Sequence, residues 1–170
     1  MEAVAEARLG QQEEGVRELA GKYLTFSLGD EDYGLGILKV REIIGVMEIT
    51  AVPHTPKYIK GVINLRGRVI PVLDLRLKFA MAPEEYNERT CIIVVEVQGK
   101  DGAVQVGMVV DSVSEVLNIT AAEIEPPPAL GAAAETTNIL GMAKVKSEVK
   151  ILLDIDQVVG DGLLKRFEGQ

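Results

Sequence analysis

The sequence predicts an all-β protein with minor α content, built from two small five-stranded barrels that arose by internal duplication. Three observations lead to this prediction. The chain is 47% hydrophobic but only 4% aromatic and has no Trp, so its core must consist of Val, Ile and Leu, which favour strands. Short apolar runs alternate with glycine turns along the whole chain. Finally, two sets of residues recur later in the sequence at constant offsets.

Composition excludes several classes of function. A net charge of −8 in 170 residues and a pI near 4.8 argue against nucleic-acid binding, which needs clustered Lys and Arg. Cys91 is the single cysteine, so no internal disulfide or thiolate metal cluster can form. The acidic N-terminus and the absence of an 18-residue apolar run predict a cytoplasmic protein that does not insert into a membrane.

The first quarter of the chain begins with a flexible acidic leader over residues 1–21, interrupted by glycines and predicted to be a frayed helix or a tail. Leu24–Leu28 then alternates apolar and polar side chains before the Gly29-Asp30 turn signal, which indicates a β-hairpin. Over 40–47 the apolar spacing predicts a short turn of helix that leads into a strand ending at Val52.

A helix is predicted over residues 55–64. Thr55 can cap the first turn, Pro56 suits the first helical position, and Asn64 can end the helix in a left-handed conformation. The apolar face of this helix would consist of Ile59, Val62 and Ile63.

The next segment, GVINLRGRVIPVLDL, predicts a hairpin that turns at Arg66-Gly67-Arg68. Its second strand, Val69–Leu75, is almost continuously apolar and is therefore expected to be buried on both faces. Pro71 has no N–H to donate, so the strand should run along a sheet edge or bulge there.

The second half of the chain follows a similar order. After a polar connector over Ala80–Arg89, Cys91–Val97 and Val104–Val113 predict another hairpin. Residues 125–138, with three prolines, predict a loop. The strand Val149–Ile155 comes next, followed by a short C-terminal helix that begins near Asp156.

Two alignments reveal the duplication. One G-x-x-h-x-x-V-x-E-h-h pattern occurs from Gly34 and again 73 residues later, from Gly107. A second set recurs at an offset of 80, so that Gly61, Val69, Leu73, Asp74 and Leu75 match Gly141, Val149, Leu153, Asp154 and Ile155. The predicted organisation is the leader, two barrel subdomains over 22–88 and 89–160, and a C-terminal helix or tail over 161–170. Chance similarity between Val-rich strands is the less favoured explanation, because polar positions match as well.

No residue set supports catalysis. His54 is the only histidine, so no metal site or nucleophilic relay can be completed around it, and no phosphate-binding loop is present. We therefore predict no enzyme activity, no cofactor and no metal. Asp74 and Asp154 each end a buried strand, and we expect their carboxylates to accept hydrogen bonds from turn amides.

The sequence points instead to binding surfaces. Val40, Glu42, Val113 and Val116 lie in or beside the duplicated V-x-E-h element, and an apolar groove formed by both copies would suit a partner helix. An equally plausible expectation is that these valines fill the core. Arg66, on its glycine turn, is either solvated or paired with a carboxylate of a partner.

Four segments together carry a family resemblance: YGLGILKVREI, TPKYIKGVINLRGRVIPVLDLRLKF, VGMVVDSVSEVL and ILLDIDQVV. From residue 22 to about 160 the chain resembles the CheW family of bacterial chemotaxis adaptors. The resemblance implies two five-stranded SH3-like barrels around a shared core. It also implies a non-catalytic role, in which the adaptor joins the cytoplasmic tip of methyl-accepting chemoreceptors to the regulatory domain of the histidine kinase CheA at membrane-associated arrays.

The resemblance also implies binding residues. The receptor groove would be formed by Val40, Glu42, Gly61, Arg66, Val113 and Val116. Contacts with the kinase would lie at barrel ends near Glu125 and Leu130, although Glu125 stands where family members carry a basic residue. Arg66→His or Glu42→Lys is expected to weaken receptor binding with little change in melting temperature.

Other functions remain open at this point. The chain could be a CheW-like regulatory module of a CheV-type or other two-component adaptor, although no phosphoacceptor, ATP or receiver sequence is present. A small barrel could also bind an oligonucleotide or a small ligand, which the negative charge and the scarcity of aromatic residues disfavour. An enzyme of an unfamiliar type is the third alternative.

Overall fold

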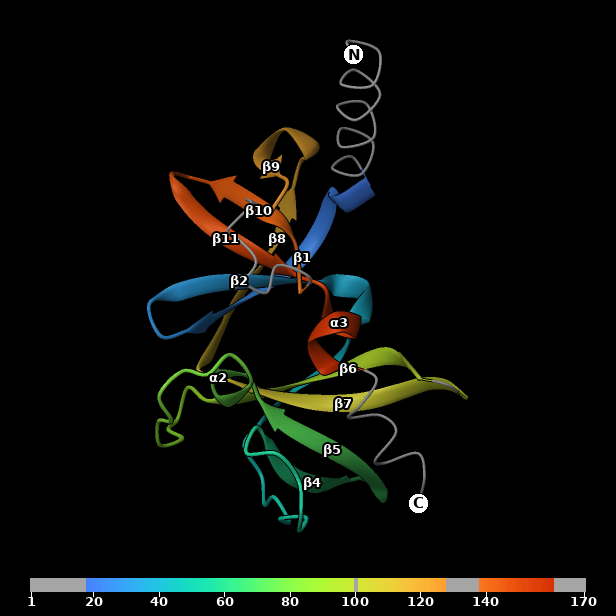
Figure 1. The fold of residues 1–170 in the computed structure, drawn as a ribbon. Coiled ribbons are helices and arrows are strands. Elements are labelled where there is room, and N and C mark those ends of the chain that lie inside the picture. The colour runs from blue at the N-terminus through green and yellow to red at the C-terminus, as the bar shows by residue number, and fades with distance from the viewer. Residues whose placement is uncertain (1–17, 100, 128–137, 161–170) are drawn as a thin grey trace, which may run out of the picture.

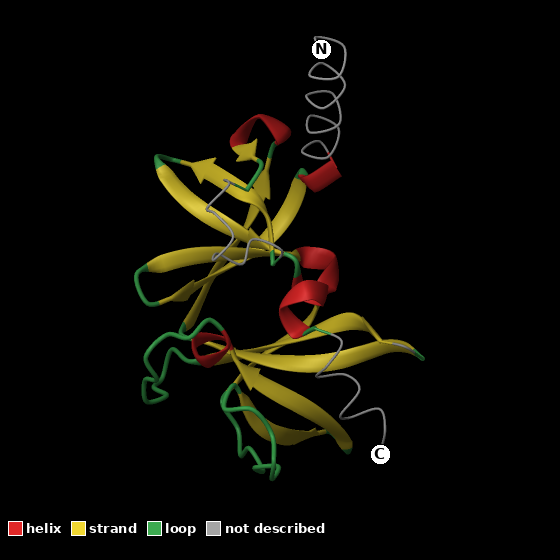
Figure 2. Ribbon diagram, in the orientation of Figure 1, coloured by secondary structure: helices red, strands yellow, loops and turns green. Residues whose placement is uncertain are grey.

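The computed structural model describes residues 18–99, 101–127 and 138–160. These residues form two β-sheets with two short α-helices between them (Figures 1 and 2). The strands are β1 Gly21–Leu28, β2 Glu31–Gly36, β3 Val40–Gly45, β4 Ile59–Leu65, β5 Arg68–Asp74, β6 Cys91–Gly99, β7 Gly102–Val110, β8 Ser112–Ile119, β9 Ile124–Glu125, β10 Ile139–Val145 and β11 Glu148–Leu153. The helical segments are η1 Ile37–Lys39, α2 Leu75–Lys78, η2 Ala121–Glu123 and α3 Ile155–Val159.

The strands assort into a six-stranded sheet, in the order β8-β1-β2-β11-β10-β9, and a five-stranded sheet, in the order β3-β6-β7-β5-β4. This confirms the predicted all-β class with minor α content. The six-stranded sheet gains its additional strand from β9, which is only two residues long. The leader up to residue 17, part of the Pro-rich segment (128–137) and the tail from 161 lie outside the described residues.

Strand pairing confirms the duplication. In the parallel pairing of β5 with β7, Val72 lies opposite Gly107. In the parallel pairing of β11 with β2, Leu152 lies opposite Gly34. These are the same two positions, related by the offsets of 80 and 73 residues seen in the sequence. The repeated sequence therefore specifies a repeated register.

Irregularities in the pairing recur as well. The β4–β5 register shifts between Ile59 and Gly61, and the β10–β11 register shifts between Ile139 and Gly141. The edge strands β3 and β8 carry a further matching pair of shifts against β6 and β1. Because bulges re-aim side chains and fix register, their duplication shows that both copies fold by the same local rules.

Each sheet combines strands from both halves of the sequence. The hairpin β1–β2 lies in the sheet of β8, β10 and β11, whereas the hairpin β6–β7 lies in the sheet of β3, β4 and β5. Residues 22–88 and 89–160 were each predicted to form one barrel subdomain, but the two repeat units exchange their first hairpins. Neither sheet is contained within one unit.

The hydrophobic core has three parts. A central cluster between the two sheets takes buried side chains from β1, β2, β6, β7 and both helices. Smaller clusters fill the concave face of the five-stranded sheet, around Ile63 and Ile92, and that of the six-stranded sheet, around Tyr23 and Ile119. Strand β6 contributes alternate residues to two clusters, Ile92 to one and Ile93 to the other, because side chains alternate along a strand. This explains the continuous apolar run from Cys91 to Val95.

Both strand-ending aspartates accept hydrogen bonds from backbone amides, as predicted, and in doing so each caps a short helix. Asp74 Oδ1 accepts a hydrogen bond from the Leu77 amide at 3.3 Å, at the start of α2. Asp154 Oδ1 accepts one from the Gln157 amide at 3.4 Å, at the start of α3. Asp74 is also buried and accepts a hydrogen bond from the Tyr86 hydroxyl at 2.8 Å. That bond ties the 80–89 connector to the five-stranded sheet.

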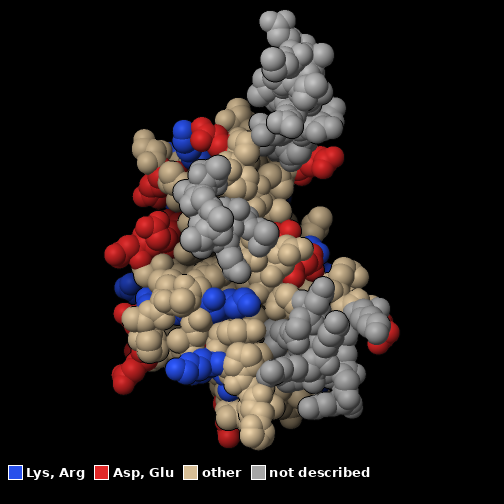
Figure 3. All heavy atoms as spheres, viewed as in Figure 1, with Lys and Arg blue, Asp and Glu red and all other residues tan. Residues whose placement is uncertain are grey.

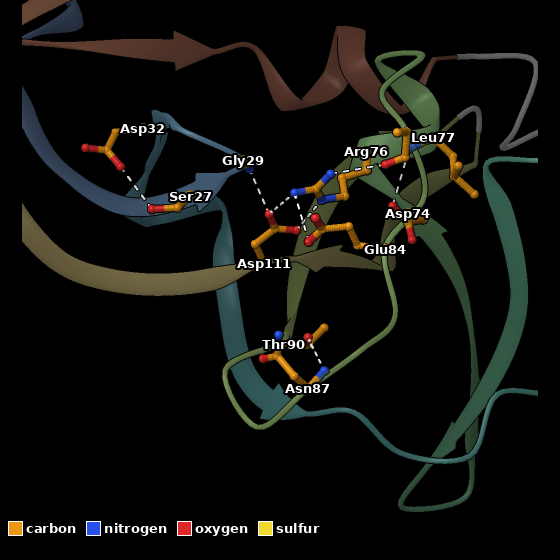
Figure 4. A network of polar contacts seen from close by, with 11 residues as sticks. Ser27, Gly29, Asp32, Asp74, Arg76, Leu77, Glu84, Asn87, Thr90 and Asp111 are labelled. Atoms are coloured by element: carbon orange, nitrogen blue, oxygen red, sulfur yellow. Dashed lines mark hydrogen bonds and ion pairs between the residues drawn. The ribbon is translucent and has the colours of Figure 1, made fainter.

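Ion pairs link each helix to the corner that precedes an edge strand. Arg76 of α2 binds Asp111 through Nε and Nη2, each at 2.6 Å, and Asp111 also accepts a hydrogen bond from the Gly29 amide (Figure 4). Asp156 of α3, the equivalent of Arg76, accepts from Lys39 at 2.9 Å and from the Gln98 amide at 3.0 Å. Lys39 lies one residue after Leu38, the equivalent of Asp111 at the offset of 73, so both helices are tied to a corner, by ion pairs of opposite sense at neighbouring positions.

The helix predicted over 55–64 is wrong, because β4 occupies Ile59–Leu65. Ile59 and Ile63 are buried together with the intervening Gly61, a period of two, and pairing with β5 fixes the extended conformation. The Thr55 hydroxyl donates to the Val52 carbonyl at 2.9 Å instead of capping a helix.

The helical turn predicted over 40–47 is also wrong. Those residues form the strand β3, and the helical turn lies just before it, in η1. Pairing with β6 overrides the i, i+3 spacing of the apolar residues. Pro71 lies inside β5, opposite Val62 and one residue before pairing with β7 begins. At Pro71 the strand pairs with β4 alone, so the residue lies on a local sheet edge, as predicted.

Candidate functional site

The strongest candidate site is an ion pair across the two edges of the five-stranded sheet. Arg66 lies in the turn between β4 and β5, and Glu42 lies on β3 at the opposite edge. The guanidinium binds the carboxylate with both nitrogens: Nη1 donates to Oε1 at 2.9 Å and Nη2 donates to Oε2 at 2.5 Å. We call this pair the Glu42–Arg66 clasp. Bidentate geometry of this kind is the most specific that an arginine can make.

Local sequence presents the arginine. Arg66 and Gly67 both have positive φ, 52° and 86°, as in the two-residue turns that suit β-hairpins. The Gly67 amide donates to Asn64 Oδ1 at 2.8 Å, which fixes the turn. The clasp was not among the alternatives that the sequence left for Arg66, because its carboxylate comes from the same chain. Hydrogen bonds from Arg66 lower the pKa of the Glu42 carboxyl from its usual value.

The strands next to the two clasp residues also carry exposed apolar side chains, Ile43 on β3 and Val69 on β5. Ile43 is 43% exposed and Val69 is 70% exposed. Ile43 pairs with the buried Ile93 of β6, so it shares the sheet face that turns toward the central cluster. Val69 is exposed because β5 pairs only with β4 at that position, and the hairpin end extends beyond β7. The exposure of Ile43 and Val69 was not predicted from the sequence, in which Val69 begins a strand expected to be buried on both faces.

The predicted valines separate into two groups. Val40 and Val113 are half-buried and pack against the central cluster, which agrees with the core alternative. Val116 is 48% exposed on the edge strand β8. Val40 and Val113 both lie on the sheet face that turns toward the central cluster, opposite Val95 and Phe26.

Gly61 is a buried residue of β4 that packs against Thr50, in the segment between β3 and β4. A Cβ there would lie 1.9 Å from the Thr50 carbonyl oxygen, and φ is +140°. Thr50 and Val62 exchange backbone hydrogen bonds at 2.8 and 2.9 Å directly beside it. The structure therefore requires glycine at position 61 to close the sheet, whatever further role the residue has.

The predicted kinase-side residues are placed only in part. Glu125 ends β9, is exposed, and accepts a hydrogen bond from Lys144 at 2.8 Å. The ion pair lies on the six-stranded sheet, away from the clasp in the five-stranded sheet. Leu130 falls outside the described residues.

Within residues 18–99, 101–127 and 138–160, no cluster of three or more His, Cys, Asp or Glu side chains could hold a metal ion. Over the same ranges no helix has the length and apolar character needed to cross a membrane. The polar features of this region are ion pairs, caps and turns.

Comparison with known proteins gives consistent matches. Residues 22–162 match the CheW-like domain family. The chain is 42% identical to a chemotaxis protein CheW of Klebsiella aerogenes over 85% of this chain and 87% of that protein. It is 35% identical to a probable chemotaxis protein CheW of Rhizobium etli, over 87% and 90% of the two chains. The crystal structure of the scaffolding protein TtCheW from Thermoanaerobacter tengcongensis superposes with a TM-score of 0.75 at 35% identity, covering 85% of this chain and 96% of that one.

Proposed function

The chain belongs to the CheW family of non-enzymatic chemotaxis scaffolding proteins, and we propose that it couples methyl-accepting chemoreceptors to the histidine kinase CheA. In this role it holds the cytoplasmic tip of a receptor against one surface and the regulatory domain of the kinase against another. The protein works in the cytoplasm and is recruited to receptor arrays at the membrane.

The observation that supports the receptor site best is the Glu42–Arg66 clasp, together with the exposed Ile43 and Val69 on the adjoining strands. A receptor tip is a helical hairpin, and an amphipathic helix binds through apolar residues spaced at i, i+3 and i+4 with polar residues beside them. Ile43 and Val69 provide exposed apolar contacts. The clasp provides a preorganised arginine and carboxylate, so little side-chain entropy is lost when the helix binds.

The remaining predicted groove residues have supporting roles in this proposal. Val116 adds an exposed apolar side chain on β8, Val40 and Val113 hold the two edge strands on the central cluster, and Gly61 allows β4 to pack against Thr50. For the kinase side, the proposal uses the end of the six-stranded sheet, with Glu125 and Leu130.

A charge-reversal series tests the receptor site. Arg66→Glu and Glu42→Arg each place two like charges together, whereas the double variant restores an ion pair of opposite sense. If the two charges contact the receptor directly, calorimetry with a purified receptor-tip fragment will show weakened binding in all three variants. Restored binding in the double variant would reduce the clasp to a structural tie.

The kinase side is tested in the same proteins. We expect the isolated regulatory domain of CheA to bind the wild-type chain and all three clasp variants with equal affinity, because the clasp does not belong to that surface. Failure of the wild-type chain to bind either the receptor fragment or the kinase domain would contradict the proposed function as a whole.

A further inference from the structure

An open pocket lies where the end of α2 meets the six-stranded sheet. Its volume is about 480 Å³, within the range of about 300–1,000 Å³ typical of ligand sites. Its walls are mainly apolar and come from Tyr33, Phe79, Ile139, Ile151 and Leu153, and its rim carries Lys78 and Asn138. We call it the α2 pocket. It shares no residue with the Glu42–Arg66 clasp.

The aromatic walls of the pocket are already ordered. The Tyr33 ring stacks on Phe79 at a centroid distance of 5.9 Å and on Phe26 at 5.7 Å. Phe26 is fully buried in the central cluster. The open end of this stack faces the pocket, because Tyr33 and Phe79 both line it. A further ring could extend the stack at the favoured separation of 4.5–7 Å.

The internal duplication supplies a counterpart with which the α2 pocket can be compared. The offsets of 73 and 80 residues place Val106, Val159, Ile59 and Leu73 at the positions equivalent to Tyr33, Phe79, Ile139 and Leu153. All four equivalent residues are buried. Of the pocket residues themselves, only Leu153 is buried to that degree. The same corner is closed in one copy and open in the other.

One substitution explains much of this difference. The carbonyls of Tyr58 and Asn138 are equivalent, since they accept hydrogen bonds from the amides of Asp74 and Asp154 at 2.7 and 2.8 Å. The Tyr58 ring packs against the central cluster, which includes Val159. At position 138 an asparagine replaces that ring. The α2 pocket therefore lacks one aromatic side chain that its counterpart contains.

The charge of Lys78 at the rim of the α2 pocket adds a second preference, for an acidic group on the ligand. The Lys78 ammonium lies 4.4 Å from the centroid of the Tyr58 ring and has no carboxylate partner among the described residues. On the face shown in Figure 3, Lys and Arg side chains gather mainly over the five-stranded sheet, in the lower part of the view. In a protein of net charge −8, a local cationic rim favours an acidic group on whatever enters the pocket.

From this geometry we propose that the α2 pocket binds the aromatic side chain of a partner protein, a phenylalanine or tyrosine that is adjacent to an acidic residue. The ring completes the stack on Tyr33 and Phe79 and takes the place that Tyr58 has in the other copy. The neighbouring carboxylate pairs with Lys78. The proposal is independent of the receptor and kinase contacts, and its test uses neither protein.

The test is a methyl NMR titration of the full chain with the dipeptide Ac-Glu-Phe-NH₂, with Ac-Glu-Ala-NH₂ as the control. We expect the methyl signals of Ile139, Ile151 and Leu153 to shift with the phenylalanine peptide alone, with a dissociation constant on the order of millimolar for so small a ligand. Intermolecular NOEs should join the peptide ring to the Ile139 and Ile151 methyls. Equal shifts with both peptides, or the absence of these NOEs, would overturn the proposal.

Variants provide a second, independent arm. Asn138→Tyr should fill the pocket and weaken the phenylalanine peptide at least tenfold, whereas Asn118→Tyr, on the exposed surface of β8, should leave binding unchanged. Lys78→Gln should weaken binding by a few fold and reduce the preference for glutamate over glutamine in the peptide. Undiminished binding to Asn138→Tyr would show that the ring enters elsewhere. The NOE measurement on the wild-type chain decides the matter if that variant fails to fold.

Discussion

The two hairpins β4–β5 and β10–β11 have the same backbone but different side chains at the tip. Both carry the same bulge, both turn through two residues of positive φ, and both end in a capping aspartate. At the tip, Arg66 and Gly67 in one hairpin correspond to Lys146 and Ser147 in the other. Arg66 reaches Glu42 of the opposite edge strand, whereas no ion pair joins Lys146 to a carboxylate in the described chain.

This comparison separates folding from function. Residues that both copies share, such as the glycines at the bulges and the capping aspartates, lie where the backbone requires them. Residues that only one copy has, such as Arg66 and Asn138, lie at the surface, where nothing in the repeated fold demands them. We therefore expect changes to shared residues to alter stability, whereas changes to exposed residues that only one copy has, such as Arg66, should alter binding.

The largest effect on stability is expected at the bulge glycines. Gly61→Ala should lower the free energy of unfolding by about 4 kcal/mol or more, because the new Cβ would meet the Thr50 carbonyl at 1.9 Å in a left-handed backbone. Gly141→Ala should cost about half as much or less, since its closest contact, with the Glu125 carbonyl, is 2.9 Å. Urea denaturation measures both, and equal losses would contradict this ranking.

The capping aspartates come next. Asp74→Ala removes a helix cap and the partner of the Tyr86 hydroxyl, so a loss of roughly 2–3 kcal/mol is expected. Asp154→Ala removes only a cap and should cost about 1 kcal/mol. Tyr86→Phe is the matched control, because it removes the hydroxyl and keeps the cap. If Asp74→Ala and Asp154→Ala have the same effect, the Tyr86 hydrogen bond contributes nothing.

The ion-pair junctions at α2 and α3 should differ by a smaller amount. Arg76→Ala breaks a bidentate pair in which the arginine side chain is only 11% exposed, and roughly 2 kcal/mol should be lost. Lys39→Ala breaks a more exposed single contact and should change stability by about 0.5 kcal/mol or less. Thermal unfolding monitored by circular dichroism measures both. A greater loss for Lys39→Ala would show that the second junction holds the sheets together.

The Arg76 junction also predicts a pH dependence. Hydrogen bonds from Arg76 lower the pKa of the Asp111 carboxyl below 3.8. At a given acidic pH the carboxyl group therefore binds fewer protons in the folded state than in the unfolded state. Its contribution to stability is complete above the unfolded pKa and is lost as the pH falls through the folded value. Between about pH 5 and pH 2, Asp111→Asn should therefore lose stability less steeply than the wild-type chain. Parallel curves in acid titrations of the melting temperature would exclude this contribution.

Sequence reasoning recovered the features that depend on local pattern and repetition. The hairpins around Gly29 and Gly99, the capping roles of Asp74 and Asp154, and the duplication itself were all predictable, because glycine turns and matched polar positions are visible in the sequence. The helix predicted from Thr55 failed because its apolar residues satisfy both periods and tertiary pairing decided between them.

Contacts between distant segments could not be predicted in the same way. Glu42 and Arg66 lie on opposite edges of one sheet, and their contact depends on how that sheet curves. The exchange of first hairpins between the repeat units cannot be seen in the sequence, because the apolar pattern of each hairpin would be the same in either sheet. The α2 pocket is visible only once Asn138 is compared with Tyr58 in the structure.

The most direct test of the central claim compares Arg66→Ala with Lys146→Ala, the equivalent residues of the two hairpins. Both side chains are exposed, so both variants should keep the wild-type melting temperature within a degree or two. Calorimetry with a receptor-tip fragment should show binding weakened at least tenfold in Arg66→Ala and unchanged in Lys146→Ala. Equal affinities of the two variants for the receptor fragment would contradict the claim that function lies in what the copies do not share.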